Sequence, residues 1–188
     1  MSEHNVLATC GFKKDNTDRP DNDYYATDPK ATRLLLEVEE FNSNILEPCC
    51  GGGHMAEVLK EYGYNVTASD IVDRGYGVIK DFFDINKWDG DIITNPPYKN
   101  VLDYTKHALD IISEGNKLAL FLRLQFLESK SRGKFFETNP PKKVYVSRSK
   151  ICCAKNGDFA NANYGAMAYA WFVWEKGFKG KPVIEWIN

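Results

Sequence analysis

The tetrapeptide Asn95-Pro96-Pro97-Tyr98 constrains the fold of this chain more than any other segment. It directly follows the apolar run Asp91-Ile92-Ile93-Thr94, so it stands where a buried strand would end. Two consecutive prolines remove two backbone donors and fix two φ angles, which makes the turn stiff. In open α/β sheets, ligands bind at the carboxyl ends of the strands. The segment therefore predicts an open α/β sheet and, taken alone, fits equally a ligand site beside Asn95 and a rigid strand-to-helix connection in which Tyr98 packs on its neighbours.

Strands and helices alternate along the rest of the chain. Asp28-Pro29 supplies an N-cap and a proline at the first position of a helix. Three expected helices carry the apolar faces Ala31, Leu34, Leu35 and Val38; Met55, Val58, Leu59 and Tyr62; and Val101, Ala108, Leu109 and Ile112, and a fourth covers residues 130–138. Strands are expected over residues 44–47, 65–69, 76–79, 91–94, 117–124, 143–147 and 166–175. This order predicts a mostly parallel seven-stranded sheet with helices on both faces and a terminal antiparallel hairpin.

Length, charge and cysteine usage narrow the class of protein. The 188 residues suit one domain, expected over residues 24–188 after a polar N-terminal segment, residues 1–23. No stretch approaches membrane-spanning length, so we expect a cytoplasmic protein with no membrane partner. The five cysteines show no zinc-site spacing, so reduced thiols and no metal are expected. The net charge of −2 does not indicate nucleic acid, but it leaves room for a local basic face.

A glycine loop follows the strand at residues 44–47. Gly51-x-Gly53-x-x-Ala56 opens a helix, and Asp70 follows about 20 residues later, as in the dinucleotide-binding fingerprint. However, Glu47 places a carboxylate where a pyrophosphate would need hydrogen-bond donors. A carboxylate suits a ligand with an ammonium group, and S-adenosylmethionine has one and carries no phosphate. We therefore expect S-adenosylmethionine rather than NAD as the cofactor.

Three further residues fit the same ligand. Asp70 can accept both ribose hydroxyls, Asp81 can accept from the adenine amino group, and Phe82 can pack on the adenine ring. Each residue also has a purely structural interpretation: Asp70 as a strand-end cap, Asp81 as a solvated acid and Phe82 as part of the core. Taken singly, Asp81 and Phe82 favour the structural interpretation, but the ordered set favours the cofactor.

These motifs, in this order, resemble those of class I S-adenosylmethionine-dependent methyltransferases, and within them the small N6-adenine DNA methyltransferases of phages and prophages. The resemblance covers roughly residues 24–175. It implies a Rossmann-like fold and a mechanism with base flipping. It also implies that the protein works in a bacterial or phage-infected host cytosol. The tetrapeptide of Asn95, Pro96, Pro97 and Tyr98 resembles the catalytic signature of that family. The residues that the resemblance assigns to the cofactor are Tyr25, Thr27, Asp28, Pro29, Glu47, Cys49, Gly51, Gly53, His54, Met55, Asp70, Ile71, Asp81, Phe82 and Asn95.

The chain departs from the family at the substrate end. Family members that read a defined site usually carry a separate target-recognition domain, and no insertion long enough for one occurs here. DNA contacts must then come from the N-terminal segment, the residues after Tyr98 and the loop at residues 150–164. The candidate substrate-binding residues are Arg123, Arg148, Lys150, Ile151 and Phe159, of which Ile151 or Phe159 would supply a second wall for the flipped base.

Several alternatives stay open at this point. The same signature suits any planar amino group, so an RNA base, cytosine N4 or protein glutamine would satisfy the same chemistry. RNA is the alternative that the sequence excludes least. A non-catalytic nucleotide-binding module would also keep the fold, although the intact Asn95 and Glu47 argue against it. An NAD-dependent dehydrogenase is disfavoured by the carboxylate of Glu47. The sequence leaves the oligomeric state open.

Overall fold

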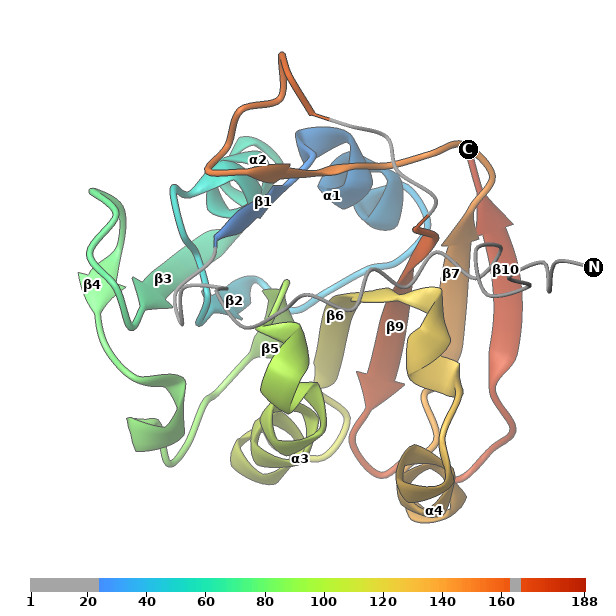
Figure 1. The fold of residues 1–188 in the computed structure, drawn as a ribbon. Helices are drawn as coiled ribbons and strands as arrows, with labels where there is room; N and C mark the ends of the chain where they lie inside the picture. Colours follow the sequence, from blue (N-terminus) through green and yellow to red (C-terminus); the bar gives the residue numbers. More distant parts are fainter. Residues whose placement is uncertain (1–23, 163–166) are drawn as a thin grey trace, which may run out of the picture.

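The fold is that of a twisted, mostly parallel sheet covered by helices on both faces (Figure 1). It is seen in a computed structural model that describes residues 24–162 and 167–188. The main sheet has eight strands in the order β10-β7-β9-β6-β5-β2-β3-β4. The strands are β2 (Asn44–Glu47), β3 (Asn65–Asp70), β4 (Val78–Ile79), β5 (Asp91–Thr94), β6 (Lys117–Arg123), β7 (Lys143–Ser147), β9 (Tyr169–Glu175) and β10 (Val183–Ile187). Only β9 runs against its neighbours β6 and β7 among these described strands.

Side-chain alternation along the strands divides the core into two layers. Ile93 belongs to the cluster under α1 (Pro29–Leu36) and α2 (His54–Glu61), whereas its neighbour Ile92 packs with α3 (Val101–Ile111). Helix α4 (Lys130–Thr138) lies on the same face as α3 and contributes Phe135 and Phe136. Because a strand's successive side chains point to opposite faces, central strands buried on both sides read as continuous apolar runs.

A second, two-stranded sheet lies above the main sheet in Figure 1. Strand β1 (Tyr25–Thr27) pairs antiparallel with β8 (Cys153–Lys155), with Ala26 opposite Ala154. This pairing brings the segment before α1 together with the segment after β7, which lies more than 120 residues further along the chain. Neither strand was expected from the sequence, since a run of three residues carries too little periodicity to identify a strand.

Most expected elements are confirmed, and the helix ends differ most. Asp28 caps α1 as expected, with its side chain accepting from the backbone N–H of Lys30 at 2.9 Å. The helices are shorter than their apolar patterns, however. Val38 is 42% exposed and Tyr62 45% exposed, because α1 ends at Leu36 and α2 at Glu61. Both assignments to a buried helix face were therefore wrong.

The sheet itself has one strand more than expected. The antiparallel pair of β7 and β9 is confirmed, but it is not at the edge, because β10 pairs parallel with β7 outside it. Strand β10 was missed because most of its side chains face solvent, with Val183 and Ile184 each 49% exposed and only Ile187 buried among residues 183–187. Part of the strand expected at residues 166–175 falls on residues 163–166, outside the described part of the chain. None of the described helices is long and apolar enough to cross a membrane.

Candidate active site

Asn95 follows β5 at the carboxyl edge of the sheet, and its side-chain amide is held in one orientation. The amide nitrogen donates to the Thr27 hydroxyl at 2.9 Å and to the Tyr25 backbone carbonyl at 3.4 Å. Since a backbone carbonyl can only accept, these contacts identify which end of the amide is the nitrogen. The opposite atom, Oδ1, accepts no hydrogen bond from any residue that the structure describes.

Strand β8 closes on the same turn through Cys153. Its sulfur lies 3.8 Å from the Asn95 amide nitrogen and 4.0 Å from the Tyr98 hydroxyl oxygen. Burial raises the pKa of the Cys153 thiol to about 11, so it is uncharged at neutral pH. Cys153 was not among the expected site residues, because its position depends on the β1–β8 pairing and not on the residue type.

The ring of Tyr98 is half-buried at the end of the turn. The Arg123 guanidinium carbon lies 5.1 Å from the ring centroid, and the Tyr169 ring centroid lies 6.4 Å away. Burial raises the pKa of Tyr98 well above its ordinary value, with Cys153 as the next contribution. Tyr98 is therefore a neutral aromatic surface with a cation on one side.

The glycine loop joins β2 to α2 and is stabilised by Asp70. The Asp70 carboxylate accepts from the backbone N–H of Gly51 at 2.9 Å and of Val72 at 3.0 Å. Gly51 and Gly53 have φ of +51° and +83°, a region that other residues rarely adopt. The strand-end capping role of Asp70 is thus present, and each carboxylate oxygen keeps a further lone pair for a ligand hydroxyl.

Tyr24 and the loop after β8 (Cys153–Lys155) lie directly against the glycine loop. The Tyr24 hydroxyl accepts from the backbone N–H of Gly52 at 2.9 Å and lies 3.1 Å from His54 Nδ1. A Cβ on Gly51 would meet the Tyr24 ring at 2.0 Å. Phe159 packs edge-on against His54, with the ring centroids 5.3 Å apart. Tyr24 was not among the expected residues, although it directly precedes the motif that begins at Tyr25.

Glu47 is buried between the sheet and the glycine loop with one oxygen unpaired. The residue is 2% exposed, and its Oε2 has no hydrogen-bond partner among the described residues. Burial raises the pKa of Glu47 well above its ordinary value, while a hydrogen bond from the Ala56 backbone opposes the shift. A buried carboxylate oxygen without a donor fits a cationic ligand group.

The expected adenine end contains an aromatic cluster. Phe82 is 2% exposed, stacks on Tyr104 with 5.2 Å between ring centroids, and lies edge-on to His107 at 4.8 Å. Asp81 caps a short 3-10 helix by accepting from the Phe83 backbone N–H at 3.0 Å. Burial raises the pKa of Tyr104 above its ordinary value, and Cys49, to which its hydroxyl hydrogen-bonds, raises it further, followed by the charges of Asp81 and Asp70.

The cluster thus brings together Cys49, which follows β2, Phe82, which follows β4, and Tyr104 of α3. Its Phe82 ring is a core side chain with its faces against protein neighbours, as the structural interpretation of the sequence had it. Tyr104 was missed because it lies inside a helix, where its spacing resembles ordinary apolar packing.

The remaining expected residues divide into two groups. Thr27, Asp28 and Pro29 lie at the β1–α1 junction, and Met55 is buried at the start of α2. Ile71 is 59% exposed beyond β3. Arg148 and Lys150 are exposed beyond β7, on the same edge of the sheet as Asn95. Ile151 is buried in the core cluster that also contains Ala31 and Leu34 of α1, and Cys153 and Tyr169 pack against that cluster. Among residues 24–162 and 167–188, no three His, Cys, Asp or Glu side chains gather as metal ligands.

Comparisons with known proteins agree with this architecture. No family model and no curated protein matches the chain. A solved structure of a candidate RNA methyltransferase from Pyrococcus horikoshii matches with a TM-score of 0.56 and 13% identity over 79% of this chain and 82% of that one. An S-adenosylmethionine-dependent O-methyltransferase from Thermotoga maritima matches with a TM-score of 0.50 and 16% identity over 81% of this chain and 67% of that one.

A third similar structure is the 23S rRNA methyltransferase ErmE, with a TM-score of 0.55 and 14% identity over 86% of this chain and 72% of that one. Similarity at these identities is evidence of fold alone. The strand order agrees with it, since one reversed strand, β9, lies between two parallel strands near the end of the sheet. The chain has the Rossmann-like α/β fold of class I methyltransferases.

Proposed function

We propose that this protein is an S-adenosylmethionine-dependent methyltransferase that acts on the N6 amino group of adenine in DNA. The observation that carries the proposal is the orientation of the Asn95 amide. Its nitrogen end is engaged by Thr27 and Tyr25, so its oxygen end is the acceptor presented by the rigid turn. A positioned acceptor at the carboxyl end of a central strand is what an amino-group substrate requires.

The chemistry of an aromatic amino group explains the need for two acceptors. The nitrogen lone pair is delocalised into the ring, which makes the nitrogen a poor nucleophile. When Asn95 Oδ1 and the Pro96 carbonyl accept its two hydrogens, the lone pair can point out of the ring plane. Pro96 has no N–H that would compete as a donor. The substrate nitrogen is thus oriented before it reacts, and positioning supplies most of the rate gain.

The described residues fit the cofactor at two points. S-adenosylmethionine, when bound, supplies an electrophilic methyl group on its sulfonium. The unpaired Oε2 of Glu47 suits its ammonium group, and the open lone pairs of Asp70 suit ribose hydroxyls. Around the adenine end, Asp81 and the Tyr104–Cys49 pair supply polar atoms. Glu47 has its carboxyl group where the pyrophosphate of NAD would need hydrogen-bond donors, which disfavours a dehydrogenase.

The substrate base must leave a duplex to reach Asn95, so base flipping is part of the proposal. Tyr98 offers its ring to the extruded base, with Arg123 on one side to interact with a ring or a phosphate. Phe159 packs on His54 instead of beside Tyr98. The aromatic wall of the substrate site therefore comes from Tyr98 and its neighbour Tyr169 rather than from the loop after β8.

Mass spectrometry of nucleosides tests the proposal. The protein is expressed in a host without DNA methylation, and DNA and RNA are digested separately. N6-methyladenine in DNA, absent from the Asn95→Ala strain, is the expected result. Methyl groups only on RNA would instead favour an RNA base, the alternative that the sequence excludes least. Methyl groups only on cytosine or on protein would contradict the adenine assignment.

A further inference from the structure

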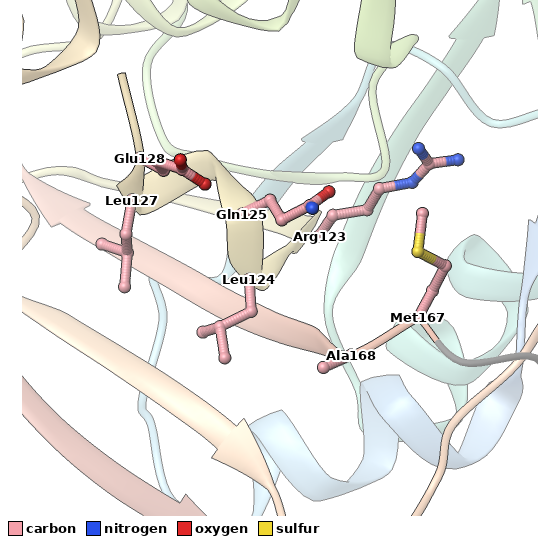
Figure 2. A pocket seen from close by; sticks show the side chains of 7 residues that line it. All are labelled: Arg123, Leu124, Gln125, Leu127, Glu128, Met167 and Ala168. Carbon is pink, nitrogen blue, oxygen red and sulfur yellow. The ribbon is translucent and has the colours of Figure 1, made fainter. Parts of the chain in front are cut away.

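A hollow of about 580 Å³ opens next to the catalytic turn, where β6 ends and β9 begins. Its walls are Arg123, Leu124, Gln125, Leu127, Glu128, Met167 and Ala168 (Figure 2). Arg123 connects it to the candidate active site, because the same guanidinium lies 5.1 Å from the Tyr98 ring centroid. The volume lies within the range of about 300–1,000 Å³ that is usual for small-ligand sites.

The two ends of the hollow differ in chemistry. Figure 2 shows Arg123 and Met167 at one end and Leu127 and Glu128 at the other, with Gln125 between them. The Nε of Arg123 is buried without a hydrogen-bond partner among the described residues. Leu127 and Met167 are each 41% exposed, which is high for large apolar side chains. A guanidinium and an exposed apolar surface together suit the phosphate and the base of one nucleotide.

The walls of the hollow are held in place by backbone contacts. The Leu124 N–H donates to the Ala168 carbonyl at 2.9 Å, which joins the two sides. Arg132 in α4 donates to the carbonyl of Gln125 at 3.2 Å and to the carbonyl of Glu128. A wall that is already ordered loses little conformational freedom when a ligand binds.

We propose that this hollow holds the nucleotide next to the target adenine on the methylated DNA strand. Arg123 contacts the phosphate between the two nucleotides, and the neighbouring base lies against Leu127. The inference rests on the proposed function and deepens it, because the segment after β6 would then make the contacts that select one substrate over another. Arg123 lies at one end of the hollow and Glu128 at the other. The negative charge of Glu128 disfavours a second phosphate at the apolar end.

Binding of short fluorescent DNA strands to the full chain, in the presence of S-adenosylhomocysteine, tests the proposal. Leu127→Asp places a charge in the apolar end and is expected to weaken binding about tenfold, because losing the burial of a leucine side chain costs about 1.5 kcal/mol. Ile184→Asp is the matched control, because Ile184 is 49% exposed on the edge strand β10. Thermal melting and S-adenosylhomocysteine affinity verify that both variants fold.

A strand with an abasic nucleotide beside the adenine identifies the base contact. The wild-type protein is expected to bind this abasic strand about tenfold more weakly than the intact strand. The Leu127→Asp variant, which has already lost the base contact, is expected to bind the two strands equally. Arg123→Gln is expected to lower the slope of log K against log salt by about 0.7–0.9, the value for one phosphate contact.

The outcomes separate the two proposals. If the wild-type protein methylates DNA adenine but Leu127→Asp binds like Ile184→Asp, the hollow proposal is overturned and the proposed function stands. If an RNA strand of the same sequence binds more tightly than DNA, the DNA assignment of the hollow is overturned. Absence of both DNA binding and methylation in the wild-type protein would overturn both proposals.

Discussion

Asn95 is the residue at which the structural and catalytic interpretations of the turn can be separated. Its amide nitrogen binds Thr27 and Tyr25, which is a structural role, and its oxygen is available, which is a catalytic one. Asn95→Ala removes both. We expect methyl transfer to fall by about 10²-fold or more, as when a positioned transition-state partner is lost. Cofactor affinity and the circular dichroism spectrum are expected to stay near wild type.

Thr27 provides the matched comparison for Asn95. Thr27→Val keeps the shape of the side chain but removes the acceptor of the 2.9 Å bond, so the amide keeps only its longer contacts with the Tyr25 carbonyl and the Cys153 sulfur. Turnover is expected to fall less in Thr27→Val than in Asn95→Ala. Thr27→Ser keeps the hydroxyl acceptor and should therefore keep most of the wild-type turnover. Near-normal turnover in a folded Asn95→Ala protein would exclude the catalytic role.

Glu47 gives a prediction about stability and pH. Burial raises the pKa of its carboxyl in the folded state, so the folded protein binds a proton that the unfolded chain, with a pKa of about 4.3, has already released. The stability that Glu47 contributes is therefore complete below that value and is lost as pH rises through the raised pKa. Glu47→Gln, which resembles the protonated form, should melt at a higher temperature than wild type at pH 8 and at a similar temperature near pH 4.

Glu47→Gln, which should raise stability at pH 8, should lower the affinity for the cofactor. Loss of a charged acceptor for the ammonium group should weaken S-adenosylhomocysteine binding about 10- to 100-fold, in line with about 1.5–3 kcal/mol for a hydrogen bond to a charged group. Titration calorimetry of both proteins at pH 8 measures it. A less stable variant with unchanged affinity would show that Glu47 is a structural residue.

At the scale of elements, the sequence predicts what depends on local patterning. The strand before the glycine loop, the capped start of α1 and all of α4 are found as expected, because caps, glycines and apolar periodicity are local signals. The contacts around Asn95 are not local. They depend on β1 and β8, two three-residue strands whose pairing is set by tertiary packing.

The candidate site divides in the same way. Glu47, Asp70 and Asn95 follow strand ends, so sheet topology alone brings them to one edge. Three further site residues come from other places: Tyr24 directly precedes β1, Tyr104 lies in α3 and Cys153 lies in β8. No pattern in the sequence distinguishes them. Ile151 shows the reverse case, since an apolar residue expected in the substrate wall is used by the core.

The glycine loop is the element whose conformation can be tested directly. Gly53 has φ of +83°, and a Cβ there would lie 2.4 Å from the Tyr76 ring. Gly63 has φ of +88° with nothing within 4 Å, so Gly63→Ala measures the backbone strain alone. We expect a loss of about 1–2 kcal/mol for Gly63→Ala and a larger loss for Gly53→Ala, seen by urea unfolding.

Cofactor binding separates the two alanine variants further. Gly53→Ala should also weaken S-adenosylhomocysteine binding, because Tyr76 and the start of α2 must shift. Gly63→Ala lies at the far end of the helix and should bind normally. Equal losses of stability in the two variants would mean that the Tyr76 ring moves aside without strain.

At the scale of the whole molecule, charge is distributed unevenly. Residues 123–158 carry nine basic and three acidic side chains, whereas the rest of the chain carries 15 basic and 23 acidic ones. Within this segment, Lys142 forms an ion pair with Glu175 and Lys143 forms one with Glu185. The other basic residues follow the carboxyl ends of β6 and β7 or lie on α4 and β8. The chain, with a net charge of −2, thus has a basic segment, residues 123–158. Its members Arg123 and Arg148 form a basic side at the sheet edge that also carries Asn95, because β5, β6 and β7 end there.

This asymmetry predicts where a DNA backbone lies on the molecule. Neutralising two basic residues on the active-site side, in Lys130→Gln/Arg148→Gln, should lower the slope of log K against log salt by about 1.4–1.8, because each lost phosphate contact removes about 0.7–0.9. The control Lys179→Gln/Lys181→Gln changes the net charge equally, but between β9 and β10 at the opposite edge. Its slope should match wild type, as measured by fluorescence anisotropy between 50 and 200 mM salt. Equal slopes for the two pairs would show that binding follows net charge alone and that the basic side does not guide the strand to Asn95.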